Sequence, residues 1–172
     1  MVIWIIGLSG SGKTYLSKKI FNKIKGKKIL VDGDTIRKYL TYNLKYSIKD
    51  RKKNSQLISD LCKFLETQGF SVVCSILSIF REHQKLNRKK FDNYFQIFIK
   101  SKFSSLKKRN NKKIYSKENV VGDAIKFPNP YKNDLIINNK FQGYSEKKIN
   151  QIVKKINNVR KNKKKDKELQ KS

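Results

Sequence analysis

Residues that build metal sites and covalent cross-links are scarce in this sequence. It has two cysteines, Cys62 and Cys74, and one histidine, His83, among 172 residues. Two cysteines do not indicate a disulfide framework, and a single histidine cannot complete a Cys/His zinc set. No apolar run approaches the ~20 residues that span a bilayer, and the N-terminal segment does not read as a signal peptide. We therefore expect free thiols, no structural metal, no membrane contact and a cytoplasmic protein.

Acidic residues are few as well. The chain has 13 aspartates and glutamates against 42 lysines and arginines, which gives a formal net charge of +29. Clustered basic residues bind polyanions because they release counterions from a phosphate backbone. Here the lysines are spread along the whole chain among many asparagines and isoleucines, as AT-rich codon bias would produce. We favour codon bias over nucleic-acid binding, and the alternative is a module that binds RNA or DNA through its lysine-rich C-terminal segment.

Short apolar segments alternate with amphipathic ones along the chain. Helical spacing of apolar residues is present at residues 16–24, 57–65 and 149–159. Strands alternating with helices imply parallel pairing with right-handed crossovers. The sequence therefore predicts an α/β fold, a three-layer sandwich around a five-stranded parallel sheet. The five apolar segments that predict the strands are residues 2–6, 28–31, 71–75, 95–99 and 135–137.

The length of the chain fits one domain, which we place at residues 1–159. A polar, basic segment at about residues 101–133 separates the fourth and fifth expected strands, and long insertions of this kind are often mobile lids. From Arg160 onward nearly every residue is charged or polar. Residues 160–172 are therefore expected to form a solvated or frayed basic tail.

The first expected strand runs directly into a glycine-rich loop. Residues 7–14 fit the pattern G-x-x-x-x-G-K-[ST] between a buried strand and a helix, the context that this phosphate-binding loop requires. Its backbone N–H groups curl around phosphates, and Lys13 reaches the β- and γ-phosphates of ATP. The hydroxyl of Thr14 should hold Mg²⁺. The predicted phosphate loop consists of Gly7, Leu8, Ser9, Gly10, Ser11, Gly12, Lys13 and Thr14.

A pair of carboxylates follows the second expected strand, at the sheet edge where open α/β folds bind ligands. Asp32 is placed to accept a proton from an acceptor hydroxyl, and Asp32 or Asp34 can orient the waters of the magnesium ion. The alternative is that this segment is only a turn that caps the next helix. We find no guanine-reading N-K-x-D motif, so the sequence favours a kinase of small molecules over a signalling GTPase.

Three ordered motifs after the phosphate loop carry a resemblance to a known family. Residues 31–37 read V-D-G-D-T-I-R against a family pattern L-D-G-D-N-x-R, and residues 43–54 read N-L-K-Y-S-I-K-D-R-K-K-N against D-L-G-F-S-x-x-D-R-x-x-N. Residues 75–81 read S-I-L-S-I-F-R against S-F-I-S-P-[YF]-R. Over about residues 2–138 the chain resembles the adenylylsulfate kinase family, ATP-dependent kinases of a ribose 3′-hydroxyl.

The resemblance implies roles for residues on both sides of the reaction. Asp32 would be the base on the 3′-hydroxyl, with Lys13 as its catalytic partner, and Tyr46 would take the place of a phenylalanine that stacks on the acceptor base. Ser78 matches a serine proposed as a phosphorylated intermediate in some relatives, and we interpret it as a wall of the acceptor pocket. Arg109 would join the ATP site. The implied acceptor site comprises Asp34, Arg37, Tyr46, Arg51, Asn54, Ile76, Leu77, Ser78, Lys117 and Phe127.

The lid is where the sequence departs from the family pattern. An ungapped alignment on Pro130 and Tyr131 puts Ala124 where family lids carry a phenylalanine that closes over adenine, and Ile79 replaces a proline. A single gap would bring Phe127 back near that position. Relatives include a kinase of cytidine diphosphoramidate, made for phosphoramidate decoration of bacterial capsules. We favour this acceptor, with adenylyl sulfate for sulfate assimilation as the alternative. The sequence leaves open whether the protein forms a homodimer.

Overall fold

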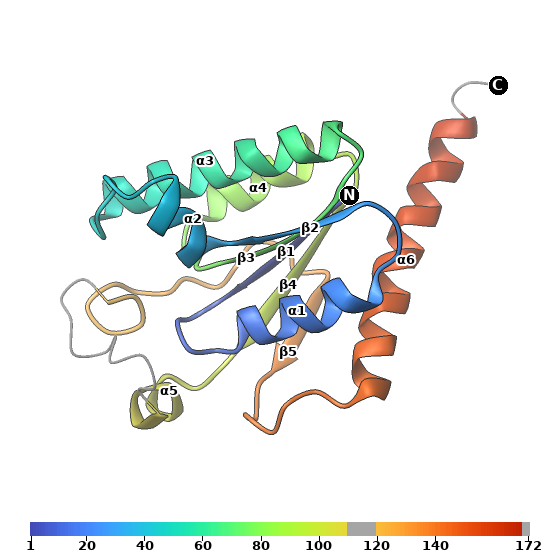
Figure 1. Ribbon diagram of the computed structural model, residues 1–172. Helices are drawn as coiled ribbons and strands as arrows, with labels where there is room; N and C mark the ends of the chain where they lie inside the picture. Colours follow the sequence, from blue (N-terminus) through green and yellow to red (C-terminus); the bar gives the residue numbers. More distant parts are fainter. Residues whose placement is uncertain (110–119, 170–172) are drawn as a thin grey trace.

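The computed structural model describes residues 1–109 and 120–169. Its centre is a sheet of five parallel strands in the order β2-β3-β1-β4-β5 (Figure 1). All five strands lie where the apolar segments predicted them, so the predicted α/β sandwich is confirmed. The strands are β1 (Val2–Gly7), β2 (Lys28–Asp32), β3 (Ser71–Ile76), β4 (Tyr94–Lys100) and β5 (Leu135–Asn138).

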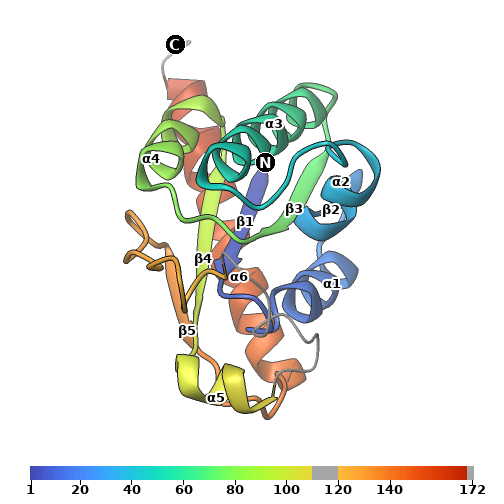
Figure 2. The same ribbon diagram turned by 90° about the vertical axis from the view of Figure 1, so that its left-hand side faces the viewer.

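Helices cover both faces of the sheet. One face carries α1 (Lys13–Lys23) and α6 (Glu146–Leu169), and the other carries α3 (Ile48–Thr67) and α4 (Arg81–Lys90), which lie side by side in Figure 2. The short α2 (Gly33–Tyr39) follows β2 and precedes α3, and α5 (Phe103–Arg109) lies in the segment predicted to be a lid. Within the described residues, no helix is both long and apolar enough to cross a membrane.

The central strand β1 feeds both halves of the core. Ile3 and Ile5 pack with residues of α1 and α6, whereas Trp4 and Ile6 pack with Ile58 of α3. Side chains alternate between the two faces of a strand, so a continuous apolar run is what a sheet covered on both sides requires. Each such fully buried side chain stabilises the fold by about 1.5–3 kcal/mol. This burial holds the end of β1, and with it the glycine-rich loop, in a fixed place.

Two helices differ from the sequence expectation. The expected solvated tail is helical for most of its length, because α6 continues to Leu169 and its C-terminal turns project beyond the sheet (Figure 1). Among the residues of this helix whose side chains the structure describes, Ile156 and Val159 are the last that pack with the core. Helix α4 was not predicted at all, since its sequence R-E-H-Q-K-L-N-R-K-K has no apolar stripe.

Polar side chains hold α4 against α3. Ser59 donates a 2.7 Å hydrogen bond to Asn87, and His83 Nδ1 lies 3.2 Å from Ser55 Oγ. These side chains are buried, and the hydrogen bonds between them offset part of the cost of placing polar groups in the interior. A helix can therefore pack on the domain without the hydrophobic periodicity by which it would be recognised in a sequence.

The buried imidazole of His83 predicts a pH-dependent stability. Burial, the largest cause, lowers the pKa of His83 from its ordinary value. The unfolded chain therefore binds the proton more tightly, and the free energy of unfolding should be highest above about pH 6.5 and fall as the pH drops, until the folded state also binds the proton. Urea denaturation at about pH 7.5 and about pH 5.5 measures this difference. His83→Gln should flatten it, and an unchanged difference in that variant would contradict the assignment.

Candidate active site

A cavity of about 990 Å³ lies at the carboxyl ends of β1, β2 and β3, where the first turns of α1 and α2 begin. This edge is where ligands bind in open parallel sheets. The cavity gathers residues that the sequence assigned to separate motifs. Those it brings together are Ser9, Gly10, Gly12, Lys13, Thr14, Asp32, Asp34, Arg37, Tyr46, Arg51, Asn54, Ile76, Leu77 and Arg109.

The glycine-rich loop has the backbone of a phosphate cradle. Gly10 and Gly12 adopt φ values of 74° and 87°, a left-handed conformation that side chains disfavour. In the described chain, no side chain caps the start of α1 at Gly12, so the positive end of this helix faces the cavity. Lys13 Nζ donates a 2.8 Å hydrogen bond to Leu8 O, which holds the ammonium over the loop. The loop is therefore shaped for a polyphosphate.

The carboxylate of Asp32 joins three elements at the floor of the cavity. Oδ2 accepts hydrogen bonds from Thr14 Oγ1 at 2.9 Å and from Ser75 Oγ at 2.8 Å. Oδ1 accepts from the backbone N–H groups of Asp34 at 3.1 Å and Thr35 at 3.2 Å, so Asp32 also caps α2. Burial by itself would raise the pKa of Asp32, but these hydrogen bonds outweigh it and the pKa is lowered. Asp32 is therefore an anion at neutral pH, and the capping and catalytic interpretations are compatible.

The same residues offer oxygen ligands for a hard cation. The Thr14 hydroxyl and the Asp32 carboxylate are hydrogen-bonded neighbours, and Asp34 lines the same cavity. Mg²⁺ prefers such oxygens, uses few protein ligands and keeps several waters. Among the described residues, no cluster of three or more His, Cys, Asp or Glu side chains could form a dedicated metal cage. The residues present thus fit an ion that arrives with a nucleotide.

Two arginines surround Tyr46 on the other side of the cavity. The guanidinium carbons of Arg37 and Arg51 lie 4.9 and 5.2 Å from the centre of the Tyr46 ring. Arg37 Nη1 donates to the carbonyl oxygens of Leu44 and Lys45 at 3.0 and 2.8 Å, and Arg51 Nε donates to Tyr46 O at 2.9 Å. Burial, and then the charge of Arg37, lower the pKa of Arg51. The two cations therefore hold the loop that precedes α3 as well as lining the cavity.

Other predicted site residues lie away from the cavity surface. Ser78 is 1% exposed, and Phe127 stacks on Phe98 with ring centres 5.8 Å apart. Neither residue lines the cavity, so their acceptor roles stay predictions. Lys117 lies outside the described residues. The remaining loop residues Gly7, Leu8 and Ser11 are buried and do not line the cavity.

The sequence motifs missed one wall of the cavity, the segment that follows β5. Asn139 Nδ2 donates to Ser11 O at 2.8 Å, and Asn139 Oδ1 accepts from the N–H of Phe141, which has a φ of 61°. The Arg109 guanidinium lies 4.8 Å from the centre of the Phe141 ring, and the rings of Tyr15 and Tyr144 stack at 6.0 Å. Parallel pairing of β5 could have revealed this wall, because its carboxyl end meets the same edge of the sheet as β1.

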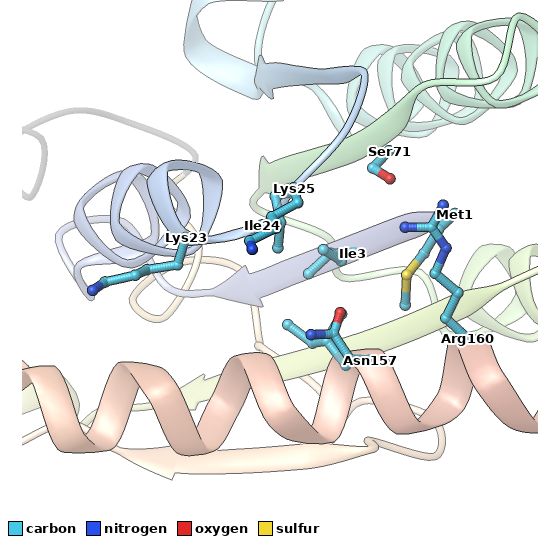
Figure 3. A pocket seen from close by; sticks show the side chains of 9 residues that line it. Met1, Ile3, Lys23, Ile24, Lys25, Ser71, Asn157 and Arg160 are labelled. Carbon is cyan, nitrogen blue, oxygen red and sulfur yellow. The ribbon is translucent and has the colours of Figure 1, made fainter.

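A second, smaller cavity of about 160 Å³ lies at the opposite end of the sheet. Met1 precedes β1 and Ser71 opens β3, so this cavity borders the amino ends of the strands. Figure 3 shows Arg160 and Asn157 reaching it from α6, with Ile3 at its floor. It shares no lining residue with the large cavity, and we assign the active site to the large one.

Comparisons with known proteins agree with this geometry. The family model described as adenylylsulphate kinase matches residues 1–138. A cytidine diphosphoramidate kinase of Campylobacter jejuni is 35% identical over 164 residues, 90% of this chain and 95% of that protein. A probable adenylyl-sulfate kinase of Pseudomonas aeruginosa is 30% identical over 129 residues, 73% of this chain and 60% of that protein.

A solved structure extends the agreement to the fold. The APS kinase of Mycobacterium tuberculosis, in complex with AMPPNP and APS, has a TM-score of 0.78 and 25% identity, and the match covers 93% of this chain and 96% of that one. The family match spans the glycine-rich loop, both carboxylates and the arginine-bearing loop. The resemblance inferred from the motifs is confirmed. The chain is therefore a nucleotide kinase, and it belongs to the adenylylsulphate kinase family.

Proposed function

We propose that this kinase transfers the γ-phosphoryl group of ATP to the ribose 3′-hydroxyl of a nucleoside 5′-phosphate anhydride, with cytidine diphosphoramidate as the favoured acceptor. One observation carries the proposal. The phosphate loop, the Asp32 carboxylate and the Arg37/Arg51 pair line a single cavity of about 990 Å³. Such a transfer requires a binding site for the donor phosphates, a group that accepts the proton and a binding site for the anionic acceptor.

On the donor side, the loop and Lys13 hold the phosphates and offset their negative charge. Thr14 and Asp32, with Asp34 beside them, would hold Mg²⁺, which when bound neutralises charge on the phosphate oxygens. The Arg109 and Phe141 pair, together with Tyr15 and Tyr144, forms the wall at which the base of ATP would lie. The enzyme thus works mainly by positioning and by charge stabilisation, as is general for phosphoryl transfer.

On the acceptor side, Asp32 orients the 3′-hydroxyl and receives its proton. A carboxylate with a lowered pKa is a weak base, but in a loose transition state the proton leaves late and orientation matters more than basicity. Arg37 and Arg51 supply guanidinium donors to the anhydride group, for which their fork geometry is suited. Tyr46 holds both guanidiniums beside the acceptor site.

The choice of cytidine diphosphoramidate rests on relatives and on the lid. The Campylobacter jejuni relative carries that name and aligns over 90% of this chain. Of the described lid residues, those that line the cavity are Leu106, Arg109, Val120 and Val121, none of them aromatic. Phe127, the candidate ring for an adenine sandwich, packs on Phe98 instead. Loss of one stacking face costs about 1–3 kcal/mol of base binding, which weakens the case for adenylyl sulfate.

The catalytic roles predict distinct effects of two substitutions. Lys13→Ala should abolish turnover, because the γ-phosphate loses its cation. Asp32→Asn should lower kcat by roughly 10²–10⁴-fold with ATP binding largely kept, since a base acts in the transition state. Asparagine is as good an N-cap as aspartate, so α2 should stay intact.

The matched control is Asp60→Asn, the same substitution at a carboxylate on α3 that pairs with Lys90 outside the cavity. Steady-state kinetics of the three variants with ATP and cytidine diphosphoramidate measure the effect, and Asp60→Asn should keep the kcat of the unmodified enzyme. Unchanged kcat in Asp32→Asn would show that this carboxylate only caps the helix.

The acceptor preference is tested by kcat/KM for both nucleotides with the same enzyme, because specificity is a ratio of those values. We expect the ratio to favour cytidine diphosphoramidate by about tenfold or more, which corresponds to about 1.4 kcal/mol. The same margin in favour of adenylyl sulfate would assign the enzyme to sulfate assimilation with an unusual lid.

A further inference from the structure

A buried hydroxyl lies directly behind one of the acceptor-side residues. Asn54 of α3 lines the cavity, and its Oδ1 accepts a 2.6 Å hydrogen bond from Thr41 Oγ1. Both side chains are 4% exposed, and Thr41 does not line the cavity. We propose that Thr41 is a positioning residue, which fixes the amide of Asn54 so that its nitrogen faces the anionic group of the acceptor. This inference rests on the proposed binding of that group beside Arg37 and Arg51.

The orientation of this amide has a direct electrostatic consequence. An asparagine side chain carries an acceptor oxygen on one side and two N–H donors on the other. With the oxygen bound to Thr41, the donors are the groups left to turn toward a ligand. Asn54 follows Arg51 by three residues on α3, so the amide and the guanidinium lie on the same face of the helix. An amide oxygen at this place would repel the anion that Arg51 attracts.

The backbone of Thr41 is anchored independently of its hydroxyl. Its N–H donates to Ile36 O at 3.1 Å, and its carbonyl oxygen accepts from the N–H of Leu44 at 2.9 Å. The loop between α2 and α3 is therefore fixed at this residue by backbone hydrogen bonds. Removal of the hydroxyl should release the amide of Asn54 and leave the course of the loop unchanged.

The test compares two substitutions at Thr41. Thr41→Val has nearly the same shape but no hydroxyl, and it should raise the KM for the acceptor about tenfold, as expected when a hydrogen bond to a charged group is weakened. The kcat value and the KM for ATP should change little, because neither the phosphate loop nor Asp32 is touched. Thr41→Ser restores the hydroxyl and should restore the KM.

Two controls separate positioning from a general loss of packing. Ser59→Ala removes a similar buried bond, from Ser59 Oγ to Asn87 Oδ1 at 2.7 Å, on the same helix but outside the cavity. It should lower stability and leave the acceptor KM unchanged. In an Asn54→Ala background, Thr41→Val should cause no further rise in KM, because a residue that acts through another has no effect once that residue is gone.

A binding measurement keeps the inference separate from the proposed reaction. Calorimetric titration with cytidine 5′-diphosphate and adenosine 5′-diphosphate is run with the phosphate loop filled by a saturating non-hydrolysable ATP analogue, so that it measures the acceptor's anion site without turnover. Thr41→Val should weaken the tighter of the two by about tenfold. If the enzyme phosphorylates neither proposed acceptor, the proposed function fails while this prediction still stands. The inference is overturned by an unchanged KM and Kd in Thr41→Val, by an equal loss in Ser59→Ala, by additive effects with Asn54→Ala, or by no diphosphate binding to the unmodified protein.

Discussion

The carboxylate of Asp32 is the interaction on which the rest of the active site depends. It accepts hydrogen bonds from the hydroxyl of Thr14 in the phosphate loop, from the hydroxyl of Ser75 in β3 and from two backbone N–H groups at the start of α2. One side chain thus fixes the phosphate loop relative to β3 and the start of α2, the elements between which we propose the transfer to occur. Because its four donors come from three elements, their relative positions are set before any substrate binds. Preorganisation of this kind is what makes charge stabilisation effective in phosphoryl transfer.

The side of the cavity that we propose for the acceptor is also fixed in advance, by two cations. Arg37 and Arg51 donate hydrogen bonds to the carbonyl oxygens of residues 44–46 and lie on the ring of Tyr46. The loop is therefore held by groups that also line the cavity. Burial, and then the positive charge of Arg37, lower the pKa of Arg51, so the two guanidiniums repel each other. The electron-rich ring between them offsets part of that repulsion. An anionic acceptor would remove the rest, which gives a physical reason for the site to prefer a charged ligand.

Local patterns in the sequence predicted the sheet and the phosphate loop, because each depends on consecutive residues. Val2–Gly7 reads as a buried strand, and the glycines that follow permit the left-handed φ values that the loop needs. Motif spacing also found Arg37, Arg51 and Asn54. Helix α4 escaped prediction because its buried residues, His83, Gln84 and Asn87, are polar and give no apolar periodicity. His83 and Asn87 pair with α3, whereas Gln84 hydrogen-bonds the backbone of Ser78 and Tyr131. The helical extension of α6 escaped for a similar reason, since its composition resembles that of a solvated tail.

Parts of the cavity that depend on contacts between distant segments could not be predicted from the sequence. The wall after β5 meets the phosphate loop through Asn139 and Ser11, which are 128 residues apart, and Phe127 stacks on Phe98 and does not line the cavity. The two halves of the site therefore differ in how freely they can change. The proposed site for the donor phosphates depends on one short loop whose backbone conformation requires glycine, whereas the proposed acceptor half is assembled from a loop, a helix and the predicted lid segment. Substitutions in the acceptor half can alter which nucleotide is held without disturbing Asp32 or the phosphate loop. A single chemistry with different acceptors among related kinases follows from this division.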